Sequence, residues 1–114
     1  EGGMCMNVYV ANDGLVQTNK RTRIFRGSRN VQTINMIGDF PDYSKVEIKI
    51  RLPDKIVLED EMEFREKGHW TFTLEEMHTY IAGKVGISFA IYFDDKRLTT
   101  PPLNINIEDS ILEE

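Results

Sequence analysis

Every second residue is apolar in several stretches of this chain. The clearest stretch covers residues 45–52, where Val46, Ile48, Ile50 and Leu52 stand between charged side chains. The same period of two recurs over residues 70–74, 87–93 and 103–107. Successive side chains of a β-strand point to opposite faces, so each stretch has one apolar and one polar face. The pattern is typical of antiparallel sheets that pack one face against a core.

Clusters of turn-forming residues separate these stretches. Glycine, proline, asparagine and aspartate favour turns because they tolerate or impose the backbone angles that turns require. They gather at residues 12–14, 27–30, 38–44, 53–55, 67–68 and 94–96. Further strands are predicted over residues 6–10, 22–26, 31–37, 56–64, 85–93 and 97–99, with 56–64 forming a hairpin with 45–52. About seven or eight short strands predict an all-β fold, an immunoglobulin-like antiparallel β-sandwich.

Residues 73–82 break the alternation and predict one short connecting helix. Thr73 and Glu76 have the spacing of a capping box, with Thr73 as the N-cap and Glu76 reaching back to it. Gly83 follows the segment, as expected after the end of a helix. His78 is expected on the polar side of this helix.

The length of 114 residues and the 40% hydrophobic content fit one domain with a modest core. We interpret residues 1–3 as an addition made for expression, with Met4 as the natural start. Residues 4–21 are predicted to be an N-terminal arm or a short strand, and residues 22–112 the β-sandwich domain. No stretch approaches the roughly 20 apolar residues of a membrane-spanning helix, so membrane insertion is not expected.

The net charge of −5 disfavours a nucleic-acid partner, because phosphate contacts need a positive field. The charge is uneven along the chain, with a basic run at residues 20–29 and an acidic tail at 108–114. This asymmetry is compatible with a head-to-tail contact between subunits. Two solvated surfaces are the simpler interpretation. A basic edge strand would also be protected against edge-to-edge aggregation.

No set of residues has the spacing of a catalytic or metal site. Cys5, His69 and His78 lie far apart in the sequence, whereas a structural zinc site takes four ligands, often in close pairs. Adjacent carboxylates at 75–76 and 94–95 are explained by helix-terminus and turn preferences. We therefore expect a protein that is not an enzyme and has no cofactor or metal. The single cysteine excludes an internal disulfide and is compatible with a reducing compartment.

Aromatic residues in the loop at 38–44 are the best candidates for contact with a partner. Phe40 and Tyr43 lie between two predicted strands, and loops carry binding residues more often than strand faces do. An alternative is that Phe40, beside Pro41, closes one end of the sandwich. Trp70 lies on an apolar strand face, so we predict that it packs in the core and does not bind sugar. Four arginines of the basic run are further candidates for a partner surface: Arg21, Arg23, Arg26 and Arg29.

One order of motifs extends over most of the chain. Arg26-Gly27 precedes the strand at 31–37, and the alternating run KVEIKIRLPDK (45–55) ends in Pro-Asp-Lys. Residues 70–112 continue with a short strand, a turn, a long aromatic strand, a charged hairpin, a Thr-Pro step and a final strand before Ser-Ile-Leu. In this order the chain resembles the N-terminal immunoglobulin-like domain of the phage baseplate upper protein family. The resemblance covers residues 22–112, and the N-terminal segment departs from it.

The resemblance implies a structural, non-catalytic virion module of a tailed phage, assembled in the bacterial cytoplasm. Such a module connects the baseplate or tail tip to receptor-binding proteins, so its expected partners are other virion or tail proteins and copies of itself in a trimer. Two other functions stay open. One is a carbohydrate-binding or adhesin-type sandwich that recognises a cell-surface glycan. The other is an accessory domain of a larger enzyme.

Overall fold

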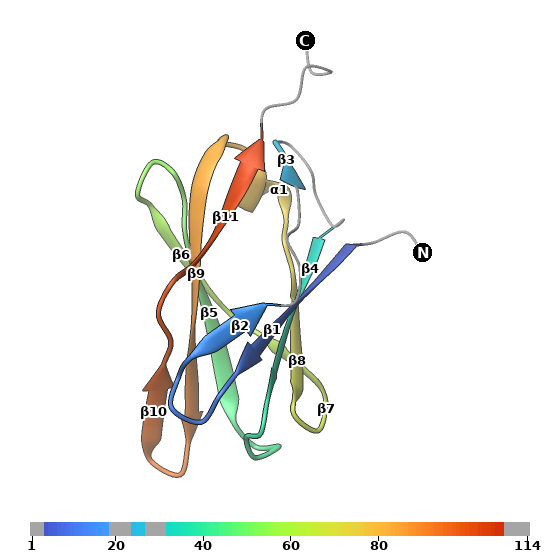
Figure 1. Ribbon diagram of the computed structural model, residues 1–114, viewed down its shortest axis with the longest axis vertical. Helices are drawn as coiled ribbons and strands as arrows, with labels where there is room; N and C mark the ends of the chain where they lie inside the picture. Colours follow the sequence, from blue (N-terminus) through green and yellow to red (C-terminus); the bar gives the residue numbers. More distant parts are fainter. Residues whose placement is uncertain (1–3, 19–23, 27–31, 109–114) are drawn as a thin grey trace.

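Two β-sheets pack face to face around one hydrophobic core (Figure 1). The computed structural model describes residues 4–18, 24–26 and 32–108. The strands are β1 (Met4–Val10), β2 (Val16–Thr18), β3 (Ile24–Phe25), β4 (Gln32–Gly38), β5 (Lys45–Arg51), β6 (Val57–Glu61), β7 (Glu63–Glu66), β8 (His69–Thr73), β9 (Gly83–Phe93), β10 (Lys96–Thr99) and β11 (Leu103–Glu108). One short helix, α1 (Glu76–Thr79), connects β8 to β9. The predicted all-β sandwich with a short connecting helix is confirmed.

The first sheet has the strand order β2-β1-β4-β8-β7. Strand β1 runs parallel to β4, with Met6 beside Ile34 and Val8 beside Met36. This pair departs from the purely antiparallel pattern that the alternation predicted. Parallel neighbours need a long connection, which residues 11–31 provide. Because Met6, Val8 and Val10 are buried in the common core, β1 is built into the sandwich.

The second sheet has the order β3-β11-β9-β5-β6, with β10 also paired to β9. Its β11-β9-β5-β6 order corresponds to strands G-F-C-C′ of an immunoglobulin variable domain, and β4-β8-β7 to strands B-E-D. The strand predicted over 22–26 is described only as the two-residue β3, which lies parallel to β11 at the edge of the sheet.

Two prolines divide the path along one side of β9 into β10 and β11. β10 pairs with the last part of β9, and β11 pairs with its first part. Between them, Thr100 donates its N–H to the carbonyl of Phe89 at 3.1 Å and accepts the Phe89 N–H on its hydroxyl at 3.0 Å. Pro101 and Pro102 have no N–H to donate. The Thr100 hydroxyl therefore accepts the hydrogen bond of a β9 N–H that would otherwise have no strand partner at this interruption.

The apolar positions of the alternating stretches form the core. Val46, Ile48 and Ile50 are at most 1% exposed, whereas Lys45 on the other face of β5 is exposed. Trp70 is also 1% exposed, which confirms its predicted place in the core. Burial of this apolar surface contributes about 25 cal/mol per Å² to folding.

The segment predicted as one strand over 56–64 is two strands in different sheets. β6 ends at Glu61 in the second sheet, and β7 starts at Glu63 in the first. Met62, between them, is 4% exposed and donates its N–H to the carbonyl of Val46 at 2.8 Å. The methionine side chain anchors the crossing in the core. The prediction of a continuous strand was wrong because neither a glycine nor a proline marks this crossing.

The prediction of the helix cap was also wrong. Glu75, not Thr73, is the N-cap of α1, and its N–H donates to Nδ1 of His78 at 2.9 Å. The Thr73 hydroxyl instead contacts the hydroxyl of Thr33 across the first sheet at 3.3 Å. His78 is 5% exposed and packs edge-on against the ring of Phe72, so its predicted place on the polar side is corrected. A buried imidazole satisfies the free N–H at the start of the helix.

Candidate functional site

Three connections between strands lie together at the lower end of the sandwich in Figure 1. They are the β4–β5 loop (38–44), the β7–β8 turn (67–68) and the β9–β10 turn (94–95), and we call them the lower loop cluster. The N–H of Gly38 donates to the carbonyl of Gly68 at 3.0 Å, which joins the first two. Side-chain contacts of the β4–β5 loop join the third.

Phe40 closes the lower end of the core. Its side chain is 4% exposed, and its ring centroid lies 5.8 Å from that of Phe93. A Cβ added at Gly38 would lie only 2.4 Å from a ring carbon of Phe40. The prediction that Phe40 is an exposed contact residue is therefore wrong, and the alternative that it closes one end of the sandwich describes it. An aromatic ring beside a glycine has room to turn inward, where it buries more apolar surface.

Tyr43 is the exposed aromatic residue of the cluster, with 69% of its surface accessible. Its hydroxyl donates to Oδ1 of Asp94 at 2.7 Å. This hydrogen bond, with the negative charge of Asp94, raises the pKa of the Tyr43 hydroxyl. Asp94 and Asp95 both have positive φ, as in the type I′ turns that suit two-residue hairpins. The tight turn thus holds a carboxylate at a fixed distance from the loop tyrosine.

An open hollow of about 530 Å³ lies beside these residues. Its lining side chains come from Asp39, Phe40, Pro41, Asp42, Tyr43 and Lys67. The carboxylates and the ammonium group can form hydrogen bonds with the hydroxyl groups of a ligand. The exposed aromatic ring can stack on an apolar face of the same ligand. This hollow is suited to a polar ligand with an apolar side, such as a sugar.

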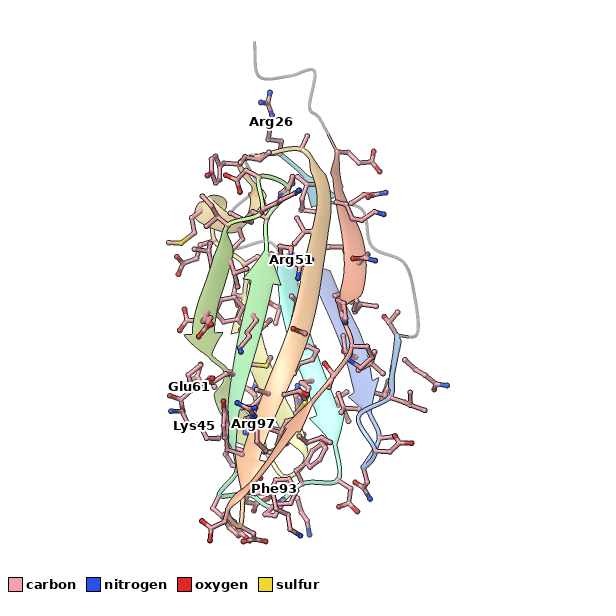
Figure 2. The ribbon with its side chains drawn as sticks, turned by 90° about the vertical axis from the view of Figure 1, so that its left-hand side faces the viewer. Arg26, Lys45, Arg51, Glu61, Phe93 and Arg97 are labelled. Carbon is pink, nitrogen blue, oxygen red and sulfur yellow. The ribbon has the colours of Figure 1, made fainter. Side chains whose placement is uncertain are left out.

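Of the four basic residues predicted as a partner surface, the structure describes only Arg26. Arg21, Arg23 and Arg29 lie outside the described residues. Arg26 is exposed at the upper end of the molecule, where Figure 2 labels it, and its N–H donates to the carbonyl of Glu108 at 2.7 Å. Arg26 and the β4–β5 loop therefore lie at opposite ends of the sandwich (Figures 1 and 2).

The outer face of the second sheet is a charged surface that the sequence reasoning did not select. We call it the charged face, and Figure 2 shows Lys45, Arg51 and Arg97 along it. A hollow of about 170 Å³ on this face is lined by Lys49, Arg51, Val57, Gly86, Ser88 and Pro102. The sequence signal was present, because charged residues at 45–51 alternate with core residues while β9 has glycine, serine and alanine at its outward positions.

Neither histidine belongs to a group of possible metal ligands in the part of the chain that the structure describes. His69 Nε2 lies 3.0 Å from Oδ1 of Asn35, whose amide donates to Oδ1 of Asn7 at 3.0 Å. Since the Asn35 oxygen accepts this bond, the His69 nitrogen is its donor. Burial lowers the pKa of His78, against the opposing charges of Glu75 and Asp60.

Residues 4–18, 24–26 and 32–108 contain neither a cluster of metal ligands nor a membrane-spanning helix. No three or more His, Cys, Asp or Glu side chains in these ranges gather where they could hold a metal ion. No helix in them has the length and apolar character needed to cross a membrane. The chain matches no protein-family model, and a search of curated proteins finds no match to it.

Proposed function

We propose that this chain is a structural, non-catalytic module of a tailed-phage virion that positions receptor-binding proteins on the baseplate or tail. One observation carries the proposal: the motifs of the resemblance coincide with the strands of the sandwich. KVEIKIRLPDK supplies β5 and the turn after it, and the described residues from 70 onward supply β8 to β11. A motif order that follows the strand order is what a shared architecture produces.

The surfaces of the molecule support a role in assembly. The charged face is a continuous outer sheet surface, and β6 and β7 are exposed edge strands of their sheets. Unpaired strand edges and charged sheet faces are surfaces through which β-sandwiches contact other proteins. Other virion proteins and further copies of the chain are the proposed partners.

Light scattering on this chain and on its full-length natural gene product tests the proposal. We expect the full-length product to form a trimer or another closed ring, and purified phage particles to contain it by mass spectrometry. A strict monomer in both samples, absent from particles, would contradict the virion role.

The lower loop cluster favours a second candidate, recognition of a cell-surface glycan. The supporting observation is Tyr43, which stands exposed beside Asp94 and the open hollow. Titration with host wall glycans should then show binding that Tyr43→Ala weakens about tenfold, since a sugar-stacking aromatic contributes on the order of 1–2 kcal/mol. Tyr80→Ala is the matched control, because Tyr80 is 47% exposed beside α1 and far from the hollow. Equal binding by wild type and Tyr43→Ala would exclude this site.

A further inference from the structure

Charges on β5 and β6 of the charged face are matched only in part. Glu47 is opposite Glu61 in the strand register, and like charges in directly opposite positions destabilise a sheet. Glu47 is already engaged, because Lys45 Nζ lies 3.5 Å from its carboxylate and the Tyr92 hydroxyl donates to it at 3.4 Å. Glu61 has no cationic partner among the described residues.

Positive charge is in excess farther along the same face, beside the 170 Å³ hollow. Lys49 and Arg51 form one wall of the 170 Å³ hollow. Lys49 is opposite Glu59 in the strand register, but neither cation makes an ion pair within the described ranges. Arg51 is opposite Val57 on one side and Gly86 on the other, so the strand register places no carboxylate beside it. A cation of this kind is available to an anionic group from outside the molecule.

The hollow has room for such a group. Its floor comes from Gly86 and Ser88, and a Cβ at Gly86 would meet no atom closer than 3.6 Å. One water in the liquid takes roughly 30 Å³, so 170 Å³ can hold a carboxylate with its methylene groups. Pro102 closes the side opposite the cations.

The chain carries a complementary surface on the exposed edge of the same sheet. Glu59, Asp60 and Glu61 are consecutive on β6, all three are exposed, and we call them the acidic edge. Figure 2 shows Glu61 at the side of the molecule, away from Arg51 in the middle of the face. The strand register places Glu59 opposite Lys49 and Glu61 opposite Glu47, so the acidic edge borders the charged face and its cationic hollow.

We propose that the acidic edge of one copy docks on the charged face of a second copy, with a carboxylate of β6 entering the hollow beside Lys49 and Arg51. This inference rests on the assembly role proposed above and names its surface. If only one acidic edge is used in each contact, the contact is heterologous and builds a ring or a filament, whereas reciprocal use of both edges makes a twofold dimer. The net charge of −5 opposes association at long range, but physiological salt screens charges beyond about 8 Å and leaves the local contact dominant.

Two single charge reversals test the contact in sedimentation and light-scattering experiments on the chain and its natural full-length product. Arg51→Glu reverses the face, and Glu61→Lys reverses the edge. Each should weaken association about tenfold or more, as measured for close interfacial charge pairs. An equimolar mixture of the two variants should associate again, because each supplies the charge that the other needs.

Two features separate docking from simple misfolding. Glu61→Lys removes a like-charge pair and should leave the fold at least as stable as wild type while it weakens association. Gly86→Val fills the hollow without a change of charge and should weaken association as well. Thermal unfolding of every variant provides the folding control.

The outcomes distinguish the inference from the function on which it rests. If the wild-type product associates and neither charge reversal alters it, this docking surface is overturned and the assembly role stands. In that case the carboxylates of β6 act only to keep edge strands apart. If the wild-type chain and its full-length product both stay monomeric at physiological salt, both proposals fail.

Discussion

The substitution Gly38→Ala tests whether the Phe40 ring closes the lower end of the core. A methyl group at Gly38 would lie 2.4 Å from Phe40 Cε2 and 2.9 Å from the carbonyl oxygen of Val10. Both distances are shorter than real carbon contacts, and the carbonyl belongs to backbone that cannot rotate away. Gly38→Ala must therefore displace the Phe40 ring, which is 4% exposed.

The size of the effect follows from what the ring loses. Overpacking a core costs about 1–3 kcal/mol, and complete loss of a buried phenylalanine side chain costs about 3–5 kcal/mol. We expect Gly38→Ala to lower the free energy of unfolding by about 2–4 kcal/mol, between these two cases. This is a large part of the roughly 5–15 kcal/mol that stabilises a domain.

Urea unfolding followed by the fluorescence of Trp70 measures this loss, because Trp70 is the single tryptophan and is buried. Gly86→Ala is the matched control, since Gly86 is also in a strand but its added Cβ has no contact below 3.6 Å. The control should change stability by less than about 1 kcal/mol. In a Phe40→Leu background the cost of Gly38→Ala should shrink, because the conflicting ring is gone. Equal midpoints for the two glycine variants, or strict additivity with Phe40→Leu, would refute the proposed closure.

Three further predictions concern the core, the helix cap and the broken edge. Ile48→Asp should prevent folding, because an unpaired buried charge costs several kcal/mol. Lys49→Asp puts a like charge opposite Glu59 and should cost only about 1 kcal/mol or less; similar circular dichroism losses for both would contradict the assignment of faces. The lowered pKa of His78 means that the unfolded chain binds a proton more readily than the folded one, so stability should fall as the pH drops below about 6.5, and urea midpoints of His78→Gln should lack this part of the pH dependence. Thr100→Ala should cost about 1–3 kcal/mol in thermal unfolding by leaving the Phe89 N–H unpaired, and Thr100→Ser should restore most of it; two equally destabilised variants would assign the effect to the lost methyl group.

Local pattern was enough to predict the faces of the strands. The side chains of β5, and those of β9 as far as Phe89, alternate between core and solvent. A strand with apolar side chains at every second position can bury them only by turning that one face to the core. The short helix after β8 was also predictable, since the alternation stops there. These features depend on residues close together in the sequence, so one sequence is enough to predict them.

Features that depend on distant residues were not predictable in the same way. At Met62 the chain crosses from the second sheet to the first. The acidic residues on both sides of Met62 predict one continuous strand, so the sequence does not reveal the crossing. His78 is buried because Phe72 and the start of α1 enclose it. The spacing of apolar residues along the helix does not predict this burial. Of the two loop aromatics chosen from the sequence, Tyr43 is exposed and Phe40 is not, because Phe93 comes from another strand.

The parallel strand pairs, β1–β4 in the first sheet and β3–β11 in the second, join distant parts of the chain and are expected to form late in folding. Ile24 pairs with Ile107 and Met6 with Ile34, while the β5–β6 and β9–β10 pairs are local hairpins. Hairpins form within microseconds, but contacts between distant segments must wait for the slow closure of long loops. During synthesis, β9 and its hairpin partner β10 are complete before β11 leaves the ribosome, so the first part of β9 stays unpaired on that side until β11 arrives. The interval before that closure is when a nascent chain is most exposed to aggregation.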